Sequence, residues 1–60
     1  MESYILIIDD DSTVSTMTRR GLTYEGFEVT VTADGRAGLL KTLERQPDLI
    51  ILDVMMPGIN

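Results

Sequence analysis

Apolar and polar positions divide the chain into three segments with a strand pattern and two with a helix pattern. Tyr4–Ile8 and Leu49–Leu52 are unbroken apolar runs, which are typical of parallel strands buried on both faces. Residues 27–32 instead alternate apolar and polar side chains, which predicts a half-exposed strand at the edge of a sheet. Pro47 does not fit a central strand, so the last strand is expected to begin after it.

The first helical segment covers residues 12–25, and its apolar side chains fall on one arc that predicts the face packed on the sheet. We expect Met17 and Tyr24 to lie in the core. Gly26 followed by Phe27 predicts a Schellman C-cap. The apolar arc consists of Val14, Met17, Gly21, Leu22 and Tyr24.

The second helical segment follows a turn at Asp34 and Gly35 and extends to about Gln46. The side chain of Asp34 is expected to cap its N-terminus. The predicted apolar face consists of Leu39, Leu40 and Leu43. The predicted outward side consists of Lys41, Thr42 and Arg45.

The resulting order, β-α-β-α-β, predicts an α/β fold with a parallel sheet. Right-handed crossovers place the helices on the faces of the sheet and the first and third strands side by side. If the alternating strand lies at the edge, the strand order is 2-1-3. The carboxyl ends of the two apolar strands then meet at one edge of the sheet.

Acidic residues occupy both of these strand ends. Three consecutive carboxylates, Asp9, Asp10 and Asp11, repel one another unless a cation or hydrogen bonds compensate. Asp11 or Ser12 can cap the following helix, so we assign Asp11 to capping and the other two to chemistry. Asp53, taken alone, is equally well explained as a carboxylate that ends a strand. The sheet order predicts that Asp9, Asp10 and Asp53 converge.

Composition narrows the chemistry of such a site. The chain has 60 residues, a net charge of −5, no cysteine and no histidine. A thiolate or imidazole metal site is therefore excluded, and an oxygen site suited to Mg²⁺, Ca²⁺ or Mn²⁺ remains. The acidic balance argues against direct nucleic-acid binding by this segment. The sequence contains no membrane span and no basic segment before its first apolar run, so we expect a cytoplasmic location.

The acidic strand ends belong to two longer motifs. Residues 6–11 read Leu-Ile-Ile-Asp-Asp-Asp, and residues 52–58 read Leu-Asp-Val-Met-Met-Pro-Gly. With Ala33, Gly35 and the Pro-Asp pair at 47–48, they resemble the amino-terminal half of a bacterial response-regulator receiver domain. The resemblance covers essentially the whole chain. It implies the β-α-β-α-β half of a flavodoxin-like parallel sheet.

The same resemblance implies a role for each acidic residue. In receiver domains the aspartate matching Asp53 accepts a phosphoryl group from a phosphohistidine on a sensor histidine kinase or phosphotransfer protein. The residues matching Asp9 and Asp10 bind Mg²⁺ together with Asp53, and the backbone carbonyl matching Met55 binds the same ion. These roles suit the chemistry, because Mg²⁺ prefers carboxylate and phosphate oxygens and a carboxylate can form an aspartyl phosphate.

The resemblance further implies that residues 1–60 are an incomplete receiver domain. The second half of a receiver supplies a Ser or Thr and a lysine that contact the phosphoryl group. Lys41 is the single lysine of the chain, and its predicted place on the outward side of a helix rules it out for this role. We therefore expect a signalling phosphoacceptor rather than an enzyme, with little activity on its own.

Two other functions are compatible with parts of the sequence. Residues 7–14 fit the Asp-x-Asp pattern of a haloacid-dehalogenase-type phosphatase, with Asp9 as nucleophile and Asp11 as general acid. That alternative leaves residues 52–58 without a role. The other alternative is an interaction module that keeps the receiver fold and is not phosphorylated.

The predicted strand order also has a consequence for assembly. It leaves Leu49–Leu52 on an open edge, and an exposed apolar edge strand is a template for pairing with another chain. A chain of this size also buries only about 60% of its unfolded surface. We therefore expect a homodimer formed through the third-strand edge or by exchange of elements.

Overall fold

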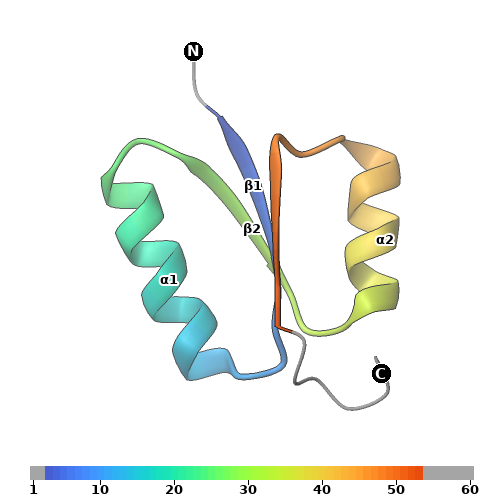
Figure 1. Cartoon of the computed structure of the whole chain (residues 1–60), viewed down its shortest axis with the longest axis horizontal. Coiled ribbons are helices and arrows are strands. Elements are labelled where there is room, and N and C mark those ends of the chain that lie inside the picture. Colours follow the sequence, from blue (N-terminus) through green and yellow to red (C-terminus); the bar gives the residue numbers. More distant parts are fainter. Residues whose placement is uncertain (1–2, 54–60) are drawn as a thin grey trace.

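Three parallel strands form one sheet in the order β2-β1-β3, and a helix lies on each face of it (Figure 1). The computed structural model describes residues 3–53. The predicted α/β class, element order and strand order are confirmed. Among the described residues, neither helix is long and apolar enough to cross a membrane. The elements are β1 (Tyr4–Ile8), α1 (Ser12–Tyr24), β2 (Glu28–Thr32), α2 (Gly35–Glu44) and β3 (Leu49–Leu52).

β1 is the centre of the structure. Its residues pair in register with both neighbouring strands, so that Ile8 lies between Thr32 of β2 and Leu52 of β3. All five of its side chains are buried, and Leu6 has no exposed surface. The apolar run of β1 is therefore buried as predicted, because a helix covers each face of the sheet and a strand pairs with each side of β1.

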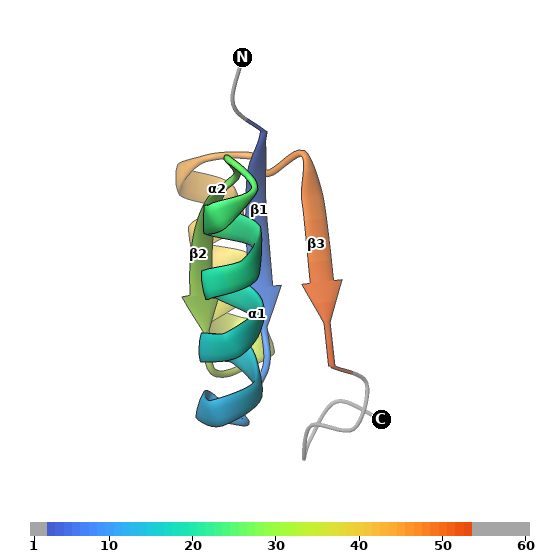
Figure 2. The same cartoon turned by 90° about the vertical axis from the view of Figure 1, so that its left-hand side faces the viewer.

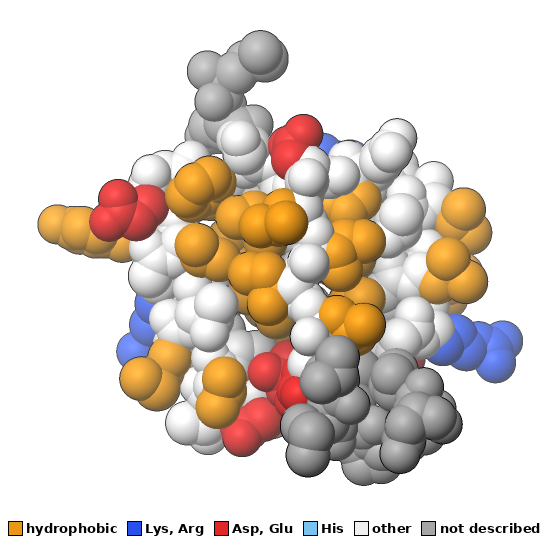
Figure 3. All heavy atoms as spheres, viewed as in Figure 1, with side chains coloured by type: hydrophobic (Ala, Val, Ile, Leu, Met, Phe, Trp, Pro, Cys, Tyr) orange, Lys and Arg blue, Asp and Glu red, His pale blue; other side chains and the backbone are white. Residues whose placement is uncertain are grey.

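β3 departs from the prediction of burial on both faces. Its side chains are between 36% (Ile51) and 55% (Leu49) exposed. The reason is the placement of the helices, since α1 packs on β2 and α2 packs on β1 and β2, whereas β3 stands beside them (Figure 2). Hydrophobic side chains consequently gather on the molecular face that carries β3 (Figure 3).

The face that α1 turns to the sheet shares only Leu22 with the predicted apolar arc. Ser15 is buried, and Thr18 and Leu22 are half-buried. Met17 and Tyr24, which were expected in the core, are 67% and 89% exposed. The contacting face is thus displaced by one residue from the apolar arc, because the small side chain of the buried serine meets the sheet.

α2 likewise packs through small residues rather than through its leucines. Gly38 is buried, and Gly35 and Thr42 on the same side are half-buried. The predicted outward position of Thr42 is therefore wrong. The predicted apolar face is wrong as well, since its three residues are more than half exposed: Leu39, Leu40 and Leu43.

Short-range hydrogen bonds cap the start of α2 and the end of α1 where the sequence predicts. The Asp34 carboxylate accepts a hydrogen bond from the Ala37 N–H, at 2.8 Å, and caps α2. At the end of α1, Gly26 has a φ of 98° and the Phe27 N–H donates to the Leu22 carbonyl at 3.1 Å, as in a Schellman motif. α2 ends at Glu44, two residues earlier than expected.

The close packing of α2 predicts that Gly38→Ala destabilises the fold. An added Cβ would meet the Ile8 side chain, with Cγ1 at 2.7 Å, and the Thr32 Oγ1 at 3.3 Å. Overpacking of this kind costs about 1–3 kcal/mol, and the better helix propensity of alanine offsets about 1 kcal/mol of it. We expect a net loss of about 1 kcal/mol in urea unfolding.

The matched control is Gly21→Ala in α1. No atom lies within 4 Å of the position of its added Cβ, so only the helix propensity changes. This variant should gain about 0.5–1 kcal/mol. Equal effects of the two substitutions would contradict the packing described for α2.

Candidate functional site

Three aspartates follow the ends of two adjacent parallel strands. Asp9 and Asp10 come directly after β1, and Asp53 comes directly after β3. Each of the two strand ends is held by a backbone hydrogen bond. The Asp9 N–H donates to the Thr32 carbonyl, and the Asp53 N–H donates to the Ile8 carbonyl, both at 3.0 Å. The sheet therefore fixes the Cα positions from which these carboxylates extend.

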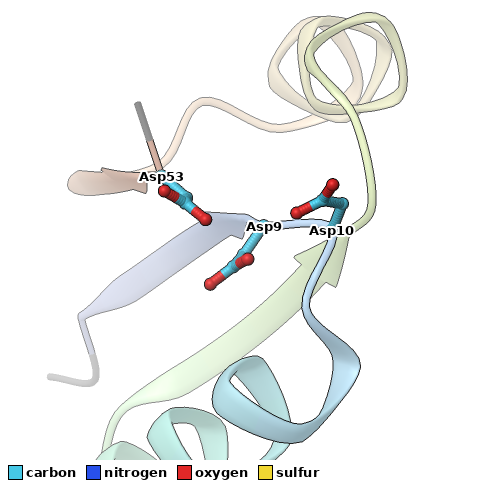
Figure 4. A group of neighbouring side chains, drawn as sticks. All are labelled: Asp9, Asp10 and Asp53. Atoms are coloured by element: carbon cyan, nitrogen blue, oxygen red, sulfur yellow. The ribbon is translucent and has the colours of Figure 1, made fainter. Parts of the chain in front are cut away.

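The three carboxylates converge as the sequence predicts. One oxygen from each of Asp9, Asp10 and Asp53 lies within 4.8 Å of the others (Figure 4). Asp9 and Asp53 are half-buried, whereas Asp10 is exposed. The side chains thus form a small acidic cluster that is open to solvent at the carboxyl edge of the sheet.

Asp11 has a separate, structural role. Its Oδ1 accepts hydrogen bonds from the Thr13 and Val14 N–H groups, at 3.0 and 3.1 Å, and this carboxylate is the N-cap of α1. Its own N–H donates to Asp9 Oδ1 at 2.8 Å. The capping bonds therefore hold Asp11 at the start of α1, and the bond from its N–H orients the Asp9 carboxylate.

The donor set of the cluster fits a hard divalent cation. The three carboxylate oxygens lie within 4.8 Å of one another, so a single divalent cation could be held by them directly or through a retained water. All three candidate ligands offer oxygen, which Mg²⁺ prefers. The expected fourth ligand, the Met55 carbonyl, lies outside the described residues.

Sequence reasoning missed the contribution of Thr32. Thr32 is one of the polar positions of the alternating strand, yet it is buried, and its hydroxyl donates to the Ile7 carbonyl at 3.3 Å. Its own carbonyl accepts the N–H of Asp9. The end of β2 therefore holds the backbone of Asp9 in place. The strand order 2-1-3 could have predicted this contact, because it places the end of β2 beside the end of β1.

Comparison with known proteins agrees with this geometry. The family described as the response regulator receiver domain matches residues 5–60. The chain belongs to this family. Receiver domains of this kind are components of two-component signal transduction, and the resemblance of the two acidic motifs is thereby confirmed.

Two curated relatives illustrate the similarity of this receiver chain to known regulators. The DNA-binding response regulator MtrA of Mycobacterium tuberculosis is 42% identical over 60 residues, which are 100% of this chain and 26% of MtrA. The transcriptional regulatory protein AfsQ1 of Streptomyces coelicolor is 45% identical over 56 residues, which are 93% of this chain and 25% of AfsQ1. The chain therefore spans about a quarter of the length of the curated relatives it matches.

Proposed function

We propose that this receiver segment is the phosphoacceptor of a two-component response regulator and that Asp53 is its phosphorylation site. The observation that carries the proposal is the cluster of Asp9, Asp10 and Asp53 oxygens within 4.8 Å, in a chain of the receiver family. The donor is a phosphohistidine on a sensor histidine kinase or phosphotransfer protein. The reaction takes place in the cytoplasm.

In the proposed reaction, a carboxylate oxygen of Asp53 attacks the phosphorus of the phosphohistidine. The new P–O bond replaces the P–N bond, and the imidazole keeps the electron pair and takes a proton from solvent. Asp9 and Asp10, with Asp53 and the Met55 carbonyl, would hold Mg²⁺, which would supply positive charge for the transferred phosphoryl group. Positioning and charge neutralisation are the main requirements of phosphoryl transfer.

Two features favour this assignment over a haloacid-dehalogenase-type phosphatase. The Asp11 carboxylate, which would have to act as general acid, is engaged by two backbone N–H groups of α1. Asp53 also lies in the same cluster as Asp9, so the third strand contributes to the site. The phosphatase assignment explains neither the capping role of Asp11 nor the place of Asp53 in the cluster.

We further propose that the 60-residue chain on its own forms a homodimer through β3. The strand pairs with β1 on one side, and among the described residues it has no neighbour on the other. Its four apolar side chains are 36–55% exposed, which makes it an apolar edge strand of the kind that pairs with another chain. The charge of −5 on each copy is screened beyond about 8 Å at physiological salt.

Binding of Mg²⁺ should raise the melting temperature of the chain, since the ion binds the folded cluster and relieves the repulsion of its carboxylates. At a Mg²⁺ concentration about ten times the dissociation constant, the gain is about 1.4 kcal/mol, which corresponds to roughly 5–10 °C in a domain of this size. Thermal unfolding followed by circular dichroism measures it. Asp53→Asn and Asp10→Asn should lose most of the shift, and an equal shift in either variant would disprove the shared site.

Phosphorylation should occur at Asp53 and should be slow in this chain alone. The nucleophile is present, whereas Lys41 is paired with Glu44 at 3.5 Å on the exposed side of α2 and does not supply charge to the site. Preorganised positive charge is commonly a large part of transition-state stabilisation. Intact mass after incubation with acetyl phosphate and Mg²⁺ should show slow addition of one phosphoryl group to the wild type and none to Asp53→Asn. Labelling of that variant would assign the nucleophile elsewhere, with Asp9 as the first candidate.

Sedimentation equilibrium at micromolar concentration should show a monomer–dimer equilibrium. Leu49→Lys should shift it toward monomer, because a charge on the edge strand opposes strand pairing. Leu43→Lys on α2 is the matched control, since it makes the same change of charge at a side chain that is 75% exposed. A wild-type monomer at all concentrations, or equal effects of the two variants, would refute pairing through β3.

A further inference from the structure

The apolar side chains of β3 define its register against β1 only weakly. The strand reads Leu-Ile-Ile-Leu between Asp48 and Asp53, so a slip of one residue still places apolar side chains at three of its four paired positions. Register is weakly specified in strands whose two faces are alike. Among the described residues β3 also has a single neighbouring strand, so a second strand does not correct the pairing. Another interaction is needed to fix it.

A pair of hydrogen bonds at the start of β3 provides this interaction. The Tyr4 N–H donates to Asp48 Oδ2 at 2.7 Å, and the Asp48 N–H donates to the Tyr4 carbonyl at 2.8 Å. One aspartate thus binds both backbone groups of the first residue of β1. We call these two bonds the Asp48 clamp. It lies at the opposite end of the sheet from the acidic cluster.

Tyr4 is a fixed partner for this clamp. It is 5% exposed, and its hydroxyl donates to Thr30 Oγ1 at 3.0 Å on β2. The guanidinium of Arg45 lies 4.2 Å from the centre of its ring and makes an ion pair of 2.6 Å with Glu28. The hydrogen bond with Glu28 also raises the pKa of Arg45, whose charged guanidinium lies over the aromatic ring of Tyr4. The Asp48 clamp consequently joins the start of β3 to Tyr4, and the side chain of Tyr4 is itself hydrogen-bonded to β2.

We propose that Asp48 is a positioning residue that fixes the register of β3 and thereby places Asp53 beside Asp9. The observed register aligns Ile5 with Leu49 and Ile8 with Leu52. A slip of one residue would move Asp53 by about 3.3 Å along the sheet and turn its side chain to the other face. Its oxygen would then leave the group that lies within 4.8 Å.

This inference rests on the proposed function of the cluster, so its test has two readouts. The first is the Mg²⁺ dissociation constant of the chain, measured by calorimetry. The second, which is independent of the ion, is the β1–β3 register given by cross-strand nuclear Overhauser effects between Ile5 and Leu49 and between Ile8 and Leu52. Removing a residue that positions a metal ligand typically weakens binding about 10- to 100-fold.

Four variants separate positioning from charge and from stability. Asp48→Ala should weaken Mg²⁺ binding at least about tenfold and change or abolish the β1–β3 contacts. Asp48→Asn removes the same charge but keeps an oxygen for the Tyr4 N–H, so it should retain wild-type register and affinity. Asp48→Glu keeps the charge but displaces the oxygen, so it should resemble the alanine variant. It replaces Asp48→Ala in the test if that variant does not fold. Asp34→Ala removes a comparable carboxylate–backbone hydrogen bond from α2 and should leave the register and the dissociation constant unchanged.

The outcomes distinguish the two proposals. Wild-type register and affinity in both Asp48→Ala and Asp48→Glu would overturn the positioning role. Equal losses in Asp48→Asn and Asp48→Ala would also overturn it, because charge rather than geometry would then explain the effect. If the wild type does not bind Mg²⁺, the proposed metal site fails, and the register measured in the same four variants still decides the role of Asp48.

Discussion

The pairing of β1 with a strand on each side is the constraint on which the rest of the structure depends. β1 is buried along its whole length, and its carboxyl end lies between the ends of β2 and β3. Parallel strands in register end at the same edge, so the residues that follow them are brought together without any contact of their own. Asp9 and Asp53 are neighbours because Ile8 and Leu52 are partners in the sheet.

The close approach of both helices to the sheet determines which apolar side chains remain exposed to solvent. Ser15 and Gly38 are the buried residues of α1 and α2, and both are small enough for a helix to lie near the sheet. The larger apolar side chains of the helices then remain in solvent, together with those of β3. A chain of this length has little core to begin with, and part of its apolar surface lies on the face that carries β3 (Figure 3).

The aspartates of this chain have different roles because different groups lie beside them. The carboxylates of Asp11 and Asp34 accept backbone N–H groups at the starts of α1 and α2, and that of Asp48 accepts the N–H of Tyr4. These carboxylates compensate backbone groups that would otherwise lack a partner. Asp9, Asp10 and Asp53 lie next to one another, and Asp9 also accepts the N–H of Asp11. The proximity of the three carboxylates sets them apart from the capping aspartates, because like charges at close range favour a bound cation.

Local pattern in the sequence determined the strands, the helices, their caps and the sheet order, because each depends on neighbouring residues or on the handedness of a crossover. It also placed Asp9, Asp10 and Asp53 at one edge of the sheet. It did not determine which helical face packs, since periodicity marks apolar side chains, whereas close packing selected Ser15 and Gly38. Nor did it reveal the contact between Tyr4 and Asp48, which are 44 positions apart and meet only in the folded sheet. Only the tertiary structure decided these points. Helix packing and long-range pairing depend on how closely two elements can approach each other, and this distance is not encoded in the sequence of either element alone.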